Sequence, residues 1–229
     1  TLFHYGFDGF VCSAGGYVGC DGKILVDIPM EPEQVSGLRA ALERAGAECT
    51  LEVRDETYGG IKMIERFANL FPKTPGKVNS EAERWRKMME FGMTICPIEK
   101  YHGEPVYKIV FIAPNEECLT EVKRQYESQF VFCESRLGDE GGGIVNGELI
   151  NRKFDKGTGI KAICGFLGCS LADTIGFGDS DNDLQMTDVV GISVCMANGS
   201  DNLKKRCDRI CPAVSEDGVA KEFAELGLI

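Results

Sequence analysis

Two histidines, one tryptophan and the lack of a long apolar run set the first limits on what this sequence of 229 residues can do. The histidines are His4 and His102, and no Cys-x-x-Cys motif occurs, so the sequence argues against a structural zinc site. No apolar run is long enough to span a bilayer, and the first residues lack the charged-then-apolar order of a signal peptide. We therefore expect a cytoplasmic protein with no membrane partner.

Basic residues are also scarce relative to acidic ones. The sequence has 25 Lys and Arg against 36 Asp and Glu, a formal net charge of −11 and a pI near 4.8. This balance argues against general binding to nucleic acid or to an anionic membrane, because both would repel an acidic protein. A local basic pocket for a phosphate group remains compatible with it.

Cysteine, by contrast, is abundant. The 11 cysteines are odd in number, scattered, and mostly placed within apolar segments. This distribution is typical of small core residues in a reduced cytosolic protein rather than of a disulfide framework. We interpret Cys12, Cys133, Cys164 and Cys195 in this way.

The hydrophobic pattern divides the chain into two parts. From Asp155 onward, strand-like apolar runs alternate with helical periodicity, a βαβ rhythm that predicts a parallel sheet. Residues 31–150 instead mix longer helices with hairpin-like strands, as expected of an inserted α+β domain. We expect a discontinuous α/β core domain from residues 1–30 and 151–229, and an α+β domain from residues 31–150.

Turn residues and periodicity predict the individual elements. Asp21-Gly22 and Asn146-Gly147 indicate hairpin turns, and the three glycines at 141–143 indicate a hairpin tip, since no Gly-Lys-Ser/Thr follows to make a phosphate-binding loop. We expect strands at residues 9–13, 17–20, 23–28, 48–53, 106–113, 130–133, 148–151, 174–177, 191–196 and 209–211. We expect helices at residues 31–45, 61–71, 80–89, 116–128, 157–167, 183–189, 200–206 and 218–226.

The most informative stretch is Thr174–Met186, in which a short apolar run gives way to polar residues and then resumes. This order predicts a buried strand, a tight turn, and a helix capped by Ser180 or Asp181. Asp179, Asp181 and Asp183 then lie at the carboxyl end of a strand, where open α/β sheets bind ligands. Three carboxylates this close repel one another unless a cation or donors neutralise them. Mg²⁺ is the first candidate because it prefers oxygen ligands.

Two simpler interpretations of this turn compete with a magnesium site. Asp and Asn favour turns by themselves, so an acidic turn between strand and helix can be without further function. Asp-x-Asp-x-Asp also opens an EF-hand calcium loop, which needs Gly at its sixth position and Glu at its twelfth. Leu184 and Val190 occupy those positions, so the sequence excludes an EF-hand.

Lys156 is the second informative residue. It lies at the first turn of a predicted helix, where exposed backbone N–H groups and the helix dipole favour an anion. Its ammonium would add a point charge for a phosphate oxygen. The alternative is a lysine that is simply solvated in a polar loop.

Four spaced motifs include these residues, and together they are far more specific than any one of them. They read K-G-T-G-I-K-A-I from Lys156, I-G-F-G-D-S-D-N-D-L-Q-M from Ile175, V-C-M-A-N-G from Val194 and E-D-G-V-A-K from Glu216. This set closely resembles the carboxyl-terminal half of Cof-like phosphatases, which belong to the haloacid dehalogenase superfamily and carry a large α+β cap of type C2B. The family's apolar strand leading into Ser-Asn-Gly-Ala is similar to Val11–Gly16.

The resemblance extends by motif over residues 7–30 and 149–229, whereas residues 31–148 match only in length and element type. It implies an α/β fold with a Rossmann-like core, a parallel sheet and an inserted α+β cap domain. It also implies a phosphoric monoester hydrolase whose substrate is a small phosphorylated metabolite such as a sugar phosphate. We expect a monomer or a weak homodimer.

The resemblance further implies a mechanism and a set of site residues. In the family, an Asp attacks phosphorus to form an aspartyl phosphate, a second Asp two residues on transfers the proton, and Mg²⁺ bridges nucleophile and phosphate. By similarity, Asp179 would bind Mg²⁺ directly and Asp183 would support it through water. Lys156 would be catalytic, stabilising the nucleophile and the transferring group. Phosphate and substrate contacts would come from Lys156, Asn182, Ser13, Gly15 and Asn198.

The sequence departs from the family in its first two motifs. No apolar strand leads into Asp-x-Asp-Gly-Thr or into a phosphate-binding Ser or Thr, and we interpret the look-alike Gly6-Phe7-Asp8-Gly9 as accidental. We expect about 35 to 50 residues to precede the sequence, judged from ordinary element lengths. The chain as given would then lack the nucleophile and be inactive, and the strand ending at Asp179 would have an unpaired edge.

Two other functions share these motifs and stay open at this point. One is a degenerate, non-catalytic binding protein, which the codons upstream of Thr1 would reveal, and the other is a phosphomutase, which would require a bisphosphate. In this branch of the superfamily the cap chooses the leaving group. The candidate residues for that choice are Glu56, Tyr58, Lys62, Trp85, Lys108 and Arg136.

Overall fold

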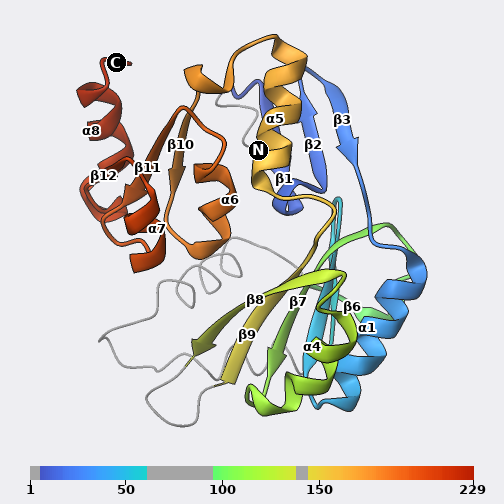
Figure 1. Cartoon of the computed structure of the whole chain (residues 1–229). Coiled ribbons are helices and arrows are strands. Elements are labelled where there is room, and N and C mark those ends of the chain that lie inside the picture. The colour runs from blue at the N-terminus through green and yellow to red at the C-terminus, as the bar shows by residue number, and fades with distance from the viewer. Residues whose placement is uncertain (1–5, 61–94, 138–143) are drawn as a thin grey trace. The chain divides into compact units, whose positions relative to one another are not determined.

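The computed structural model of the chain describes residues 6–60, 95–137 and 144–229. The chain forms two compact units, one from Thr1–Asp27 with Phe154–Ile229 and the other from Ile28–Lys153 (Figure 1). The second unit is therefore inserted in the sequence of the first. Several predicted features lie outside the described residues, namely the helices at 61–71 and 80–89, the tip at 141–143, Lys62, Trp85 and the side chain of Arg136.

The first unit begins with an antiparallel sheet of β1 (Gly9–Cys12), β2 (Tyr17–Cys20) and β3 (Lys23–Asp27). Asp21 and Gly22 join β2 to β3 with φ angles of 49° and 71°, as a two-residue type I′ turn requires. This hairpin prediction is therefore confirmed. Helix α5 (Lys156–Leu167) packs against the sheet, and Figure 1 shows it beside the blue strands.

A parallel sheet forms the rest of the first unit. Its strands are β10 (Ile175–Gly178), β11 (Ile192–Met196) and β12 (Arg209–Cys211), in that order. The predicted βαβ rhythm is confirmed, because each strand leads into a helix: α6 (Leu184–Thr187), α7 (Asp201–Arg206) and α8 (Gly218–Glu225). Short 3₁₀ helices lie at Ser13–Gly15, Leu171–Asp173, Asp181–Asp183 and Val214–Glu216.

The strand expected at residues 9–13 is β1, which in the described chain pairs with β2 and not with the parallel sheet. These two strands run antiparallel because the short segment Ser13–Gly16 joins them, and a parallel pair would need a crossover of roughly a dozen residues. Among the described strands, β10 has β11 as its one partner and lies at the sheet edge.

The second unit is built on a mixed sheet with strand order β6-β5-β4-β7-β9-β8. Among its described strands, β5 and β6 run parallel and the other neighbours run antiparallel. The strands are β4 (Glu48–Val53), β5 (Thr57–Gly59), β6 (Ile95–Pro97), β7 (Val106–Ala113), β8 (Phe130–Leu137) and β9 (Ile144–Asn151). The described helices of this unit are α1 (Pro32–Arg44) and α4 (Thr120–Tyr126), with 3₁₀ turns at Ile98–Lys100 and Glu117–Leu119. Leu38 and Leu42 of α1 and Ile109 and Phe111 of β7 are fully buried in the core between them.

Asn146 and Gly147 do not form the predicted hairpin turn. They lie inside β9, where Gly147 pairs with Phe111. A Cβ atom at Gly147 would come within 2.3 Å of the Phe111 ring, so glycine makes room here for an aromatic side chain of the core. The turn prediction is therefore wrong, and the physical reason for the glycine is close packing rather than chain reversal.

Further corrections concern the ends of elements and one cysteine. The helices predicted at 116–128 and 183–189 each begin as a 3₁₀ turn and end early, at Tyr126 and Thr187. Cys164 and Cys195 are buried as predicted, but Cys12 is exposed, so the core interpretation is wrong for Cys12. Within the described ranges, no helix combines the length and apolar character that crossing a bilayer requires.

Candidate functional site

The acidic turn begins where β10 ends. Gly178, the last residue of β10, is buried, and a Cβ atom there would lie 2.8 Å from Cβ of Asp183. Glycine thus lets the Asp183 side chain fold back over the end of the strand. Ser180, one of the two predicted caps, is the N-cap of the 3₁₀ helix Asp181–Asp183, and its backbone N–H donates to Asp183 as in a capping box.

The Asp183 carboxylate closes this turn from the inside. The whole Asp183 residue is 7% exposed. Its Oδ2 accepts hydrogen bonds from the backbone N–H groups of Asp179 at 3.0 Å and Ser180 at 3.2 Å. Its Oδ1 forms an ion pair with the Lys156 ammonium. Both oxygens therefore have hydrogen-bond donors, as buried polar groups in folded proteins generally do.

Lys156 reaches the turn from the start of α5. Asp155 caps that helix, because its Oδ1 accepts from the Thr158 N–H at 2.7 Å. A Cβ atom at Gly157 would lie 2.5 Å from the carbonyl oxygen of Gln185, so the missing side chain lets α5 and α6 approach closely. Lys156 Nζ also donates to Oδ1 of Asn182 at 3.1 Å. The structure thus brings Lys156, Asn182 and Asp183 together, as the site prediction requires.

The Ser13–Gly16 segment lies beside the start of α5. Ser13, Ala14 and Gly15 have φ angles of 50°, 57° and 108°, a left-handed conformation that costs on the order of 1 kcal/mol at each non-glycine residue. At Gly15, a Cβ atom would collide with the Asp155 carbonyl oxygen at 2.1 Å. Two predicted substrate contacts, Ser13 and Gly15, are therefore next to the residue that caps the Lys156 helix.

The other side of the acidic turn contacts the start of α7. The Ser200 hydroxyl donates to Oδ1 of Asp181, and the Asn202 amide donates to Oδ2 at 3.0 Å. The Ser200 N–H donates to the Asp179 carbonyl oxygen at 3.0 Å. The sequence analysis did not find these contacts, because they join residues about twenty positions apart that share no local pattern.

Asn198 precedes this contact in the loop after β11. Its side-chain oxygen accepts a hydrogen bond from the Val214 N–H at 3.0 Å. That bond directs the amide oxygen toward the 3₁₀ helix Val214–Glu216 and orients the whole amide group. A substrate contact from Asn198 stays a prediction, and in this geometry the amide N–H₂ group is the part that would provide it.

Asp179 is the carboxylate best placed to bind a metal ion. It is exposed, its backbone is fixed by Asp183 on one side and Ser200 on the other, and no donor among the described residues bonds its carboxylate. Mg²⁺ is commonly held by one or two carboxylates, with water and phosphate oxygens completing its shell. The carboxylate oxygens of Asp179 fit such an ion, whereas Oδ1 of Asn182 already accepts hydrogen bonds from Lys156 and Ser180. In the described ranges no three His, Cys, Asp or Glu residues are grouped as a metal site.

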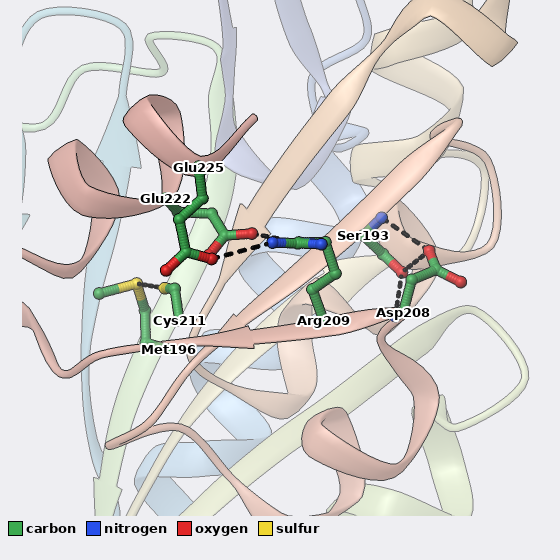
Figure 2. Close-up of polar contacts among 7 residues, drawn as sticks. All are labelled: Ser193, Met196, Asp208, Arg209, Cys211, Glu222 and Glu225. Carbon is green, nitrogen blue, oxygen red and sulfur yellow. Dashed lines mark hydrogen bonds and ion pairs between the residues drawn. The ribbon is translucent and has the colours of Figure 1, made fainter. Parts of the chain in front are cut away.

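A second polar cluster supports the far edge of the parallel sheet (Figure 2). Asp208 accepts from the N–H and O–H of Ser193 at 2.8 and 2.6 Å, and these hydrogen bonds lower the pKa of Asp208. Arg209 of β12 donates to Glu222 and Glu225 of α8, and the bond to Glu222 raises the pKa of Arg209. Because Glu222 is 2% exposed, this pair fixes α8 on β12 and serves the fold rather than the acidic turn.

The described candidates for leaving-group choice all have partners within the second unit. The Tyr58 hydroxyl donates to Glu56 at 2.5 Å, and this bond raises the pKa of Tyr58 above its ordinary value. Lys108 forms ion pairs with Glu52 at 3.1 Å and Glu148 at 3.2 Å on the neighbouring strands. A role of these residues in substrate choice stays a prediction.

Comparison with known proteins identifies the family of the chain. The family model for haloacid dehalogenase-like hydrolases matches residues 2–223. YkrA of Bacillus subtilis strain 168 is 43% identical over 129 residues, which are 56% of this chain and 46% of YkrA. A phosphoglycolate phosphatase of Haloarcula marismortui is 40% identical over 70 residues, 31% of each protein. The chain thus spans less than half the length of these curated relatives.

Solved structures resemble the chain over a longer stretch. The subclass IIB sugar phosphatase BT4131 aligns with 100% of this chain and 79% of its own, with a TM-score of 0.73 and 19% sequence identity. At that identity the likeness establishes the fold alone. The comparisons therefore confirm the resemblance that the sequence motifs indicated.

Proposed function

The chain belongs to the haloacid dehalogenase-like hydrolase family, and from this premise we propose that its protein is a Mg²⁺-dependent phosphatase of a small phosphate ester, of the sugar-phosphate class. The observation that carries the proposal is the link from Lys156 through Asp183 to the backbone of Asp179. A cation at a helix start and a carboxylate at a strand end are thereby joined in one cluster. A relative named as a phosphoglycolate phosphatase supports the choice of reaction.

Asp179 would hold the metal ion directly. Asp183 would act through water and by placing Lys156, because its two oxygens already accept hydrogen bonds from three donors. Mg²⁺ bound here would neutralise negative charge on the phosphate group and so make phosphorus easier to attack. This division between the two carboxylates follows from their different burial and partners.

Lys156 and Asn182 would bind the phosphate. An ammonium has three N–H donors, and Asn182 and Asp183 accept two of those on Lys156, which leaves one for a phosphate oxygen. Further contacts would come from Ser13 and Gly15, which lie beside the start of the same helix, and from the Asn198 amide group. The positive charge of Lys156 would also stabilise the negative charge that develops during phosphoryl transfer.

The proposal includes an aspartyl-phosphate intermediate but assigns the attacking carboxylate to no residue of this chain. Asp8, in the look-alike Gly6–Gly9, lies just before β1 and not at its carboxyl end, whereas ligands of α/β sheets bind at carboxyl ends of strands. We also propose that the unit of residues 1–27 and 154–229 is the catalytic core and that residues 28–153 form the cap. The cap would then choose the leaving group.

Phosphate release by the intact protein from a panel of sugar phosphates, with 4-nitrophenyl phosphate as a general probe, tests the proposal. Asp179→Ala should lower Mg²⁺-dependent release by at least about 100-fold, the usual loss when a main electrostatic stabiliser is removed. Asp188→Ala is the matched control, because Asp188 pairs with Arg206 outside the turn. Unchanged turnover in Asp179→Ala would refute the assignment. Metal binding without turnover of any phosphate ester would favour a non-catalytic binding protein.

A further inference from the structure

Asp181 has no part in the proposed reaction, yet its side chain has two hydrogen-bond donors on a neighbouring segment. It is exposed, and both of its carboxylate oxygens accept hydrogen bonds from the start of α7, one from the Ser200 hydroxyl and one from the Asn202 amide at 3.0 Å. These two hydrogen bonds connect the acidic turn, which contains Asp181, to the start of α7. The question is what the connection fixes.

Ser200 connects Asp181 with the backbone of Asp179. Its N–H donates to the Asp179 carbonyl oxygen at 3.0 Å. Its hydroxyl group donates a hydrogen bond to Asp181 and accepts one from the Leu203 N–H at 3.2 Å. Leu203 is fully buried, so α7 is anchored in the core independently of Asp181. Asp181 therefore attaches the acidic turn to a helix, α7, whose position is set by the packing of Leu203.

The loop before α7 lies directly on the Asp179 backbone. A Cβ atom at Gly199 would lie 3.0 Å from the Asp179 carbonyl oxygen and 2.7 Å from the Cys195 sulfur. This close approach leaves the Asp179 peptide little room to rotate. With Asp183 bonding its N–H and Ser200 bonding its carbonyl oxygen, Asp179 is fixed at both ends of the residue.

We propose that Asp181 is a positioning residue that sets the direction of the Asp179 carboxylate and thereby the affinity of the site for a divalent cation. The inference rests on the proposed Mg²⁺-dependent function. The inference assigns a different role to each of the three acidic residues of the turn. Asp179 points to the cation, Asp183 places the lysine, and Asp181 holds the turn against α7.

The test measures binding of Mn²⁺, an EPR-visible substitute for Mg²⁺, to the purified protein and to its variants. Asp181→Ala should weaken Mn²⁺ binding about tenfold, because it removes two hydrogen bonds to a charged group. It should also raise the Mg²⁺ concentration for half-maximal activity by a similar factor, with much of the lost activity recovered at high Mg²⁺. Asp181→Asn keeps an acceptor for Ser200 and should give a smaller effect, which preserves the test if the alanine variant does not fold.

Asp188→Ala is the control for general loosening, since it breaks the ion pair between Asp188 and Arg206, which joins the end of α6 to the end of α7 away from the turn. It should leave Mn²⁺ affinity unchanged. Wild-type affinity in both Asp181 variants, or an equal loss in Asp188→Ala, would overturn the inference. Failure of the unsubstituted protein to bind Mn²⁺ would instead overturn the proposed function, and this inference with it.

Discussion

The ammonium of Lys156 and the carboxylate of Asp183 form an ion pair that joins the start of α5 to the turn after β10. The Asp183 side chain is 9% exposed and that of Lys156 31%, so the pair is largely shielded from water on the carboxylate side. Such a pair is worth more than a surface salt bridge, and removing one partner leaves the other with a desolvation cost. This relationship makes the site and the stability of the first unit depend on the same contact.

Lys156→Met should therefore affect both properties. The variant leaves the Asp183 carboxylate with backbone donors only, so the free energy of unfolding should fall by about 2 kcal/mol. Phosphate release should fall by at least about 100-fold. Urea unfolding and a phosphate assay measure the two effects. Lys161→Met, at an exposed position on the same helix, should change neither, and equal behaviour of the two variants would contradict the role of Lys156.

Gly178→Ala tests whether the end of β10 must lack a side chain. The new Cβ would lie 2.8 Å from Cβ of Asp183 and displace that carboxylate, so we expect a loss of about 1–3 kcal/mol of stability together with lower activity. Gly165→Ala is the matched control, because a Cβ atom there meets nothing within 4 Å inside helix α5. It should raise stability by roughly 0.5–1 kcal/mol through better helix propensity. Thermal unfolding of the two variants in parallel would show opposite shifts.

Acid should remove one identifiable contribution to stability at the far edge of the sheet. The bonds from Ser193 depress the pKa of Asp208, so the folded state prefers the charged carboxylate. A depressed pKa stabilises the fold above the ordinary Asp value, about pH 4, and the contribution disappears as the pH falls through the folded-state pKa. The stability difference between the wild type and Ser193→Ala should thus be constant near neutrality and shrink in acid.

Unfolding at a series of pH values measures this difference. The same comparison in an Asp208→Asn background removes the titrating group and provides the control. There the effect of Ser193→Ala should no longer depend on pH. A difference that instead grows as the pH falls would show that Ser193 acts through another group.

Local sequence signals were sufficient where structure depends on neighbouring residues. The strand before Asp179, the cap at Ser180 and the helix beginning at Lys156 all follow from short patterns of apolar, polar and capping residues. The family motifs then implied that Lys156 and the acidic turn meet, which the Asp183 contact confirms. The sequence alone thus indicated which residues could bind a metal ion or a phosphate group, although it did not show the contacts between them.

What the sequence could not provide depends on contacts between distant residues. Asn146-Gly147 has the sequence of a hairpin turn. Glycine is needed at position 147, however, because the Phe111 ring on the neighbouring strand leaves no room for a side chain. Ser200 was visible as the start of a helix, whereas its bonds to Asp179 and Asp181 depend on how α7 packs beside the turn. Strands β5 and β6, with three residues each, are too short to show any alternation.

The most direct test of the central claim is a crystal structure of the protein with Mg²⁺ and a tetrahedral oxyanion such as tungstate. The account predicts a metal ion about 2.1 Å from an Asp179 carboxylate oxygen, with Asp183 reaching it through water. It also predicts an oxyanion oxygen within hydrogen-bond distance, about 3 Å, of Lys156 Nζ. A metal ion bound elsewhere in the protein, with neither Asp179 nor Lys156 contacting the metal or the oxyanion, would contradict it.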